Sequence, residues 1–174
     1  MNCSVFAGTS LDGFIARRNG ALDFLPEDCE PHGYEEFIAS VDVIIIGRNT
    51  FEVVLAFPEW PYGKKQVVVL STKKLDFSKI PGAVVEQMSG SPAEIVAQLS
   101  QRGFQHAYVD GGITVQGFLG AGLIQRLTVT RVPVLIGDGI PLFGKLPRDV
   151  KVRLISAQSY KSGLVKSEYE VVMG

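Results

Sequence analysis

The 174-residue sequence has few of the residues that build metal centres and disulfide frameworks. Its two cysteines, Cys3 and Cys29, and its two histidines, His32 and His106, show none of the close spacings that zinc sites use. Two cysteines are also too few for the dense disulfide framework of a small secreted domain. We therefore expect two reduced thiols and no metal site.

Long hydrophobic runs and a large charge of one sign are also lacking. Nothing approaches the roughly 18 consecutive apolar residues of a membrane-spanning helix, and polar residues 2–4 interrupt any signal peptide. The net charge of −1 provides no basic face for nucleic acid or an acidic membrane surface. A hydrophobic content of 46% suits a soluble globular protein, so we expect one cytoplasmic domain over residues 1–174.

Motifs of covalent catalysis and of the common nucleotide folds are missing as well. The sequence has no G-x-S-x-G elbow and no P-loop lysine motif. No G-x-G-x-x-G lies between a first strand and a helix, and residues 137–139 (Gly-Asp-Gly) precede Pro141 in an expected turn. Hydride transfer needs none of these motifs, because it requires a cofactor held against the substrate in a site that excludes water.

Short apolar runs typical of strands buried on both faces occur along the chain, most clearly at residues 43–46. Ser91 and Glu94 form a capping box, and Gly103 suits a helix end. The last three apolar segments have no helix between them, so the sequence predicts a mostly parallel α/β sheet with antiparallel C-terminal strands. The expected strands are 2–7, 42–46, 66–70, 106–109, 127–136, 152–160 and 165–172; the expected helices are 34–40, one starting near 49, one starting near 92, and 113–120; a long loop covers 8–31.

Three of these strands end in small residues rich in hydroxyl, amide and backbone N–H groups, at 47–50, 71–73 and 110–112. Parallel strands bring such ends to one edge of the sheet, where α/β proteins bind ligands. One such end is ordinary turn chemistry, but three favour an extended polyanion such as a dinucleotide. The side chains available to hold a phosphate, including the additional 2′-phosphate of NADP, are Arg48, Ser71, Thr72 and Lys73.

Five segments carry motifs in a recognisable order: 10–16 (Ser-Leu-Asp-Gly-Phe-Ile-Ala), 47–51 (Gly-Arg-Asn-Thr-Phe), 66–72 (Gln-Val-Val-Val-Leu-Ser-Thr), 111–112 with 118–119 (Gly-Gly, Phe-Leu), and 122–143. The chain resembles the dihydrofolate reductase superfamily. The first and last segments resemble more narrowly the C-terminal reductase domain of the bacterial bifunctional riboflavin-biosynthesis deaminase/reductase, and its stand-alone relatives. The resemblance spans nearly the whole chain and implies a three-layer dihydrofolate-reductase-like fold.

The resemblance also implies NADPH as cofactor and a role for each matching position. Gly8 and Ile15 would flank the nicotinamide, and the helix start at 47–50 would lie at the pyrophosphate. A cis peptide bond is implied between Gly111 and Gly112. The cofactor-binding residues implied are Gly8, Ile15, Gly47, Arg48, Asn49, Thr50, Leu70, Ser71, Thr72, Gly111, Gly112, Ile113, Thr114 and Val115.

The chain departs from its relatives on the substrate side. Residues 25–28 resemble the neighbourhood of the substrate-binding carboxylate of dihydrofolate reductases, but Asp28 lies a few residues further upstream of Gly47, so it is either that carboxylate or a solvated loop residue. The Pro-Trp of their mobile loop is replaced by residues 22–25. Asp12 precedes a glycine, so it is either a turn residue or a polar group near the nicotinamide, and Asp110 has the same ambiguity. Asp12 and Asp28 are the catalytic candidates, and no side chain is an obvious proton donor. Without a Cys/His cluster, a zinc-dependent deaminase activity is not expected.

We therefore expect an NADPH-dependent reductase that transfers hydride to a small heterocyclic or sugar-derived substrate. The resemblance suggests one like 5-amino-6-(5-phosphoribosylamino)uracil of riboflavin biosynthesis. Dihydrofolate reductase is one alternative, and a nucleotide-binding protein without turnover is another. Exposed apolar residues on the C-terminal strands would suit a homodimer.

Overall fold

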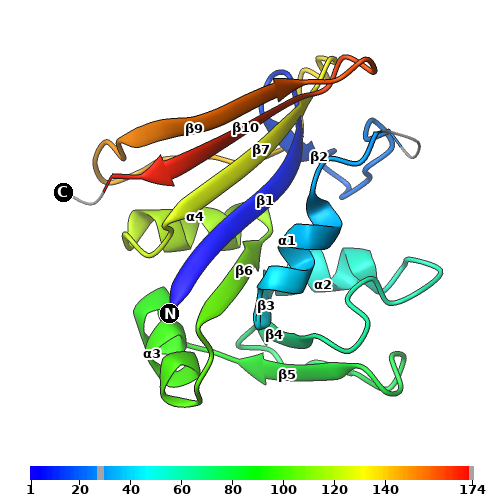
Figure 1. The fold of residues 1–174 in the computed structure, drawn as a ribbon. Coiled ribbons are helices and arrows are strands. Elements are labelled where there is room, and N and C mark those ends of the chain that lie inside the picture. The colour runs from blue at the N-terminus through cyan, green and yellow to red at the C-terminus, as the bar shows by residue number, and fades with distance from the viewer. Residues whose placement is uncertain (27–29, 173–174) are drawn as a thin grey trace.

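The computed structural model describes residues 1–26 and 30–172 and has the predicted three-layer α/β architecture (Figure 1). An eight-stranded sheet with the order β5-β4-β3-β6-β1-β7-β10-β9 forms the middle layer. β10 runs antiparallel to β7 and β9, whereas the other neighbouring pairs run parallel, as predicted. The strands of this sheet are β1 (Asn2–Ser10), β3 (Val43–Gly47), β4 (Gln66–Leu70), β5 (Val84–Met88), β6 (His106–Asp110), β7 (Arg126–Val132), β9 (Val152–Ser159) and β10 (Val165–Val171).

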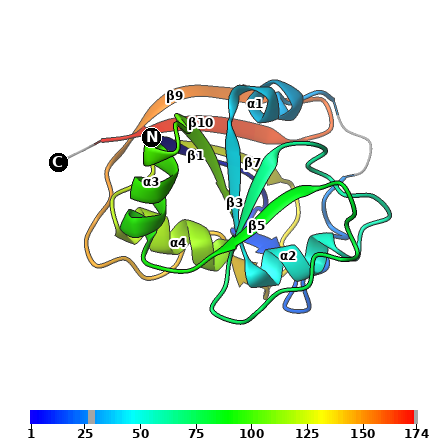
Figure 2. The same cartoon turned by 90° about the horizontal axis from the view of Figure 1, so that it is seen from below.

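The sheet separates two hydrophobic cores, and β3 contributes to both. Val43 and Ile45 pack in a core that includes residues of α3 (Pro92–Gln101) and α4 (Gly112–Gly120). The alternate residues of β3 pack in a second core with α1 (Tyr34–Ser40) and α2 (Arg48–Val54). Figure 2 shows α3 and α4 on one side of β3 and the other two helices on the other side. Burial on both faces explains why β3 is an unbroken apolar run.

Local signals set several element boundaries. The Ser91 hydroxyl accepts a hydrogen bond from the backbone N–H of Glu94, and the Glu94 carboxylate accepts one from the N–H of Ser91. Gly103, just after α3, has a φ of 94°, which favours glycine. Both the predicted capping box and the predicted helix end are therefore confirmed.

The predicted loop over residues 8–31 was wrong in its first part. β1 continues to Ser10 because it stays paired with β7. A short strand, β2 (Phe14–Ala16), then pairs with β8 (Ile140–Pro141) in a separate two-stranded sheet. The predicted strand over 127–136 ends at Val132, since Pro133 has no N–H to continue the ladder.

Within the described residues, no helix is long and apolar enough to cross a membrane. The same part of the chain holds no group of three or more His, Cys, Asp or Glu side chains placed to bind a metal ion. Cys3 is buried as a free thiol, and burial raises its pKa to about 11. Cys29 lies outside the described residues.

Candidate functional site

A cavity of about 860 Å³ opens where the carboxyl ends of β1, β3, β4 and β6 meet the starts of α2 and α4. These strands are parallel neighbours in the sheet, so the three strand ends singled out in the sequence do lie at one edge. The cavity brings together the predicted cofactor residues Gly8, Ile15, Gly47, Arg48, Asn49, Thr50, Leu70, Gly111, Gly112, Ile113 and Thr114.

A second pocket of about 370 Å³ adjoins the first and shares Arg48, Leu70 and Gly90 with it. Its remaining lining residues are Ser71, Thr72, Lys73 and Ser89, so the residues predicted to hold a 2′-phosphate also come together. Val115 is the predicted cofactor residue whose side chain lies elsewhere, since it is fully buried in the core beneath α4.

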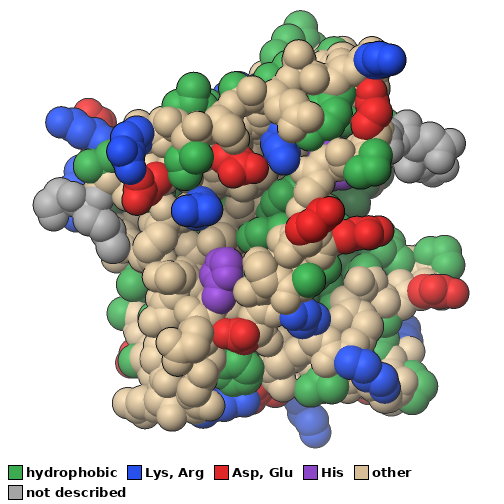
Figure 3. Space-filling view, viewed as in Figure 1, with side chains coloured by type: hydrophobic (Ala, Val, Ile, Leu, Met, Phe, Trp, Pro, Cys, Tyr) green, Lys and Arg blue, Asp and Glu red, His purple; other side chains and the backbone are tan. Residues whose placement is uncertain are grey.

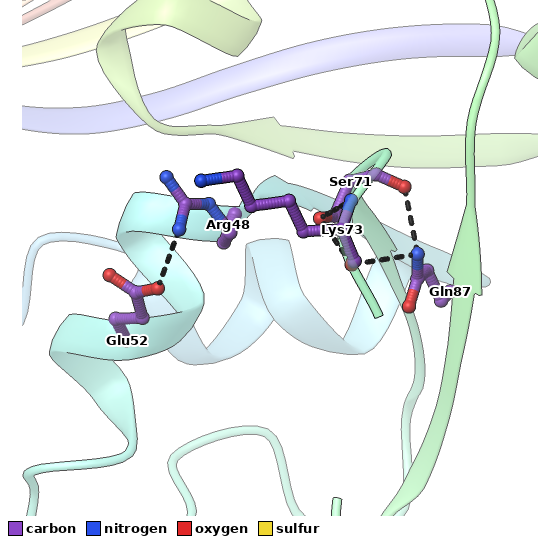
Figure 4. Close-up of polar contacts among 5 residues, drawn as sticks. All are labelled: Arg48, Glu52, Ser71, Lys73 and Gln87. Atoms are coloured by element: carbon purple, nitrogen blue, oxygen red, sulfur yellow. Dashed lines mark hydrogen bonds and ion pairs between the residues drawn. The ribbon is translucent and has the colours of Figure 1, made fainter. Parts of the chain in front are cut away.

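Two cations project toward the smaller pocket (Figure 4). Arg48, on the first turn of α2, forms an ion pair of 3.3 Å with Glu52, one turn later on the same helix. Lys73 lies in the loop after β4, where its backbone N–H donates to the Ser71 hydroxyl over 3.0 Å. That hydroxyl in turn donates to the carbonyl of Lys73 over 2.7 Å, so Ser71 shapes the loop.

The first turns of α2 and α4 lie in close contact with each other beside the cavity. Gly47 precedes α2, and a Cβ atom placed on it would lie 2.7 Å from Oγ1 of Thr114 in α4. Gly111 precedes α4, and a Cβ atom on it would overlap Oγ1 of Thr50 in α2. Glycine is therefore required at both positions by the approach of the opposite helix.

The cis peptide bond expected between Gly111 and Gly112 is not present. The described residues contain no cis peptide bond, so that expectation was wrong. Gly111 instead has φ 92° and ψ 132°, and this conformation turns the chain from β6 into α4.

Asp110 lies on the cavity wall at the end of β6, and its carboxylate accepts a hydrogen bond of 2.8 Å from the N–H of Gly111. Burial raises its pKa, because the charged form loses solvation. Three tyrosines also line the cavity: Tyr34, Tyr62 and Tyr108. Burial raises the pKa of Tyr34 to about 12, with a smaller contribution from the negative charge of Asp110. Burial at this end of the cavity therefore favours the protonated carboxyl of Asp110 and the neutral phenol of Tyr34.

A family model for the RibD C-terminal domain matches residues 3–166. The chain belongs to the RibD C-terminal domain family. A provisionally named riboflavin biosynthesis protein from Shewanella sp. PV-4 has 35% sequence identity and a TM-score of 0.91, over 99% of this chain and all of the other.

More distant members of this structural group share the fold. The diaminohydroxyphosphoribosylaminopyrimidine deaminase/5-amino-6-(5-phosphoribosylamino)uracil reductase of Thermotoga maritima has 14% identity and a TM-score of 0.78, over 98% of this chain and 56% of its own. Dihydrofolate reductase from Enterococcus faecalis, solved with NADP(H), has 13% identity and a TM-score of 0.66, over 99% of this chain and 97% of its own. The predicted dihydrofolate-reductase-like fold is therefore confirmed.

Asp12, one of the two catalytic candidates of the sequence, does not line the described cavity. Asp12 is exposed, and its carboxylate accepts hydrogen bonds from the backbone N–H groups of Ile136 (3.3 Å) and Gly137 (2.7 Å). The side chain of Ser10 contributes most to lowering the pKa of Asp12. Asp12 lies in the turn where the N–H of Gly13 donates to the carbonyl of Ser10 over 3.0 Å, and its side chain joins this turn to residues 136–137. Asp28 lies outside the described residues.

Sequence reasoning missed the aromatic side of the site. Tyr108 sits in a strand that looks like ordinary core, and its hydroxyl donates to the carbonyl of Phe6 over 3.0 Å. Tyr34 and Tyr62 come from α1 and from the loop before β4, and His32 from the segment before α1. The one available signal was the presence of tyrosines, which need a polar partner, in segments otherwise suited to the core.

Proposed function

We propose that this member of the RibD C-terminal domain family is an NADPH-dependent reductase, with residues 1–174 acting as one reductase domain. The observation that carries the proposal is the continuity of the large cavity with the smaller pocket through Arg48, Leu70 and Gly90. A dinucleotide is long enough to occupy both. Its 2′-phosphate would lie by the cations of the smaller pocket, and its nicotinamide by Gly8 and Ile15.

The donor set fits such a cofactor. The first N–H groups of the nine-residue helix α4 have no carbonyl partner within the helix, and Gly112, Ile113 and Thr114 all line the cavity. Arg48 and Lys73 carry fixed positive charges at the smaller pocket, and both lie partly in solvent. Backbone N–H groups at the middle of the groove and cations at its end match a pyrophosphate and a terminal phosphate.

When bound, NADPH supplies a hydride. We propose that Asp110 supplies the accompanying proton, so that a C=N or C=O bond gains hydride on carbon and a proton on nitrogen or oxygen. Burial raises the pKa of the Asp110 carboxyl, which favours the protonated form that an acid needs, and the N–H of Gly111 donates to the carboxyl and orients it. Burial also raises the pKa of each surrounding tyrosine, which favours their neutral hydroxyl forms.

The substrate class follows from the same walls. Phe6 and the three tyrosines line this end of the cavity, and an aromatic wall suits a planar heterocycle. Together with the family membership and the reductase of Thermotoga maritima, this supports a substrate like 5-amino-6-(5-phosphoribosylamino)uracil.

The test combines binding and turnover. We expect NADPH to bind with a measurable fluorescence change and to be oxidised when the pyrimidine ribosylamine is added. Oxidation with dihydrofolate instead would indicate dihydrofolate reductase, and binding without consumption of any substrate would indicate a nucleotide-binding protein. Absence of NADPH binding would refute the proposal.

We further propose that the protein forms a homodimer through β9. This strand is at the edge of the sheet, and all eight of its residues are exposed. Val152, Leu154 and Ile155 place apolar side chains on it, with exposed fractions of 44%, 55% and 45%. Arg153 is the one charged residue of β9, and it forms an ion pair with Glu170. A second copy of the chain that packs against β9 would therefore contact no unpaired charge on this strand. Monomeric proteins usually protect such an edge with charge or proline.

A further inference from the structure

Gln87 ties together the loop that forms one wall of the smaller pocket. It lies near the end of β5, an edge strand paired with β4, and its side chain reaches the segment 71–75 that follows β4 (Figure 4). The Gln87 amide nitrogen donates to the carbonyls of Ser71 and Lys73 over 2.8 and 3.0 Å. Its oxygen accepts from the N–H of Leu75 over 3.0 Å.

These three bonds leave the pocket-facing groups of the loop free. They fix alternate residues through their backbone, so the side chains of Thr72 and Lys73 remain available at the pocket. A second tie joins the N–H of Ser71 to the carbonyl of Met88, over 3.0 Å. The loop is therefore held from β5, and its shape depends on a side chain that does not itself line the pocket.

We propose that Gln87 is a positioning residue that sets the preference for NADPH over NADH. This inference rests on the proposed function, because it assigns the smaller pocket to the 2′-phosphate. A loop already fixed in place loses little conformational entropy when Lys73 meets a phosphate. The carboxamide is neutral, so it orders the loop without reducing the positive potential that a dianionic group would meet.

NADH gives the internal comparison. It lacks the 2′-phosphate, and its other parts would lie in the larger cavity, whose lining does not include residues 71–75. Loss of the Gln87 bonds should thus weaken NADPH and leave NADH unchanged. A general effect on folding would weaken both.

The experiment measures four dissociation constants by calorimetry on the full chain: those of NADPH, NADH, adenosine 2′,5′-bisphosphate and ADP. Gln87→Met keeps the length of the side chain and removes all three hydrogen bonds. We expect it to weaken NADPH and the bisphosphate about three- to tenfold and to leave NADH and ADP unchanged. Gln87→Glu should weaken the first pair more, because it loses the two donated bonds and adds negative charge beside the pocket.

Gln66→Met is the matched control. Gln66 lies at the opposite end of β4 from the loop, where it pairs with Val84, and its side-chain amide donates to Glu86 over 3.0 Å. It should leave all four constants unchanged. An unaltered NADPH-to-NADH ratio in Gln87→Met, or an equal loss of both, would overturn the role of Gln87 while leaving the reductase intact. Failure of the wild-type protein to bind either dinucleotide would refute the proposed function itself and this inference with it.

Discussion

Gly47 and Gly111 each directly precede a helix, α2 and α4 respectively. Replacing either glycine with alanine should lower the free energy of unfolding, but for different reasons. Gly47 has φ −82° and ψ 166°, a backbone conformation that alanine adopts freely. Gly47→Ala should lower the free energy of unfolding only because the new Cβ atom would lie 2.7 Å from Oγ1 of Thr114. Thr114 is 9% exposed. Overpacking at a buried contact of this kind costs about 1–3 kcal/mol.

Gly111→Ala carries the same kind of overlap, with Oγ1 of Thr50, and a second penalty. Gly111 has φ 92°, a region that costs a residue with a side chain about 1–3 kcal/mol. The two terms together predict a loss of about 2–6 kcal/mol in the free energy of unfolding. Replacing Thr50 with alanine removes the hydroxyl that overlaps the new Cβ atom, but it leaves the cost of the backbone conformation at Gly111.

Urea denaturation of the two double mutants separates the two causes. Thr114→Ala should restore most of the stability lost in Gly47→Ala, whereas Thr50→Ala should restore only part of the loss in Gly111→Ala. The residual deficit in the second pair should be about 1–3 kcal/mol, the cost of the backbone conformation. Equal and complete rescue in both pairs would refute the assignment of strain to Gly111. No rescue in the first pair would refute the crossing contact.

Four further outcomes test the site and the assembly. Asp110→Asn should lower kcat about 10²- to 10⁴-fold without weakening NADPH, and wild-type kcat should fall as the pH rises through the raised pKa of Asp110; a flat pH profile would count against the acid. Asp110→Asn should also have a higher free energy of unfolding than wild type at neutral pH. The pKa of the wild-type carboxyl is raised in the folded state, so the stability that it contributes at low pH is lost as the pH rises through that pKa. Arg48→Ala should weaken NADPH by about 1–3 kcal/mol in titration, whereas Arg102→Ala, which removes a cation paired with Glu86 and outside both pockets, should not. Leu154→Glu should convert a sedimenting dimer to a monomer with unchanged folding, and a monomeric wild type would exclude the β9 interface.

The grouping of the proposed cofactor-binding residues at one edge of the sheet could be predicted, because each of the three segments involved is contiguous in sequence. The helix start at 47–50, the strand end at 70–72 and the segment 111–114 are local signals. Parallel pairing of β4, β3 and β6 then brings them to one edge without any further information. The roles of the individual residues toward a cofactor remain predictions.

The aromatic side could not be predicted, because tertiary packing assembles it. Tyr34, Tyr62 and Tyr108 belong to a helix, a loop and a strand that are distant in sequence. β5 escaped prediction for a related reason: as an edge strand it is only partly buried and carries polar residues such as Glu86 and Gln87. β5 matters because the Gln87 side chain holds the loop that follows β4. A periodic pattern of apolar residues cannot reveal such a contact.

The two sides of the cavity differ in the kind of group that they present, and Asp110 joins them. The proposed cofactor side, which includes the smaller pocket, consists of backbone N–H groups, glycines and two cations, whereas the proposed substrate side consists of bulky side chains. α1 and the loop before β4 supply Tyr34 and Tyr62 from outside the sheet, so substitutions at these two positions should alter the proposed substrate side without disturbing the strand ends of the proposed cofactor side. Asp110 ends β6, and its carboxylate is held by the N–H of Gly111 at the start of α4. The turn at Gly111 therefore orients the proposed acid and also forms part of the proposed cofactor-binding wall, so our proposal places the proton donor next to the hydride donor.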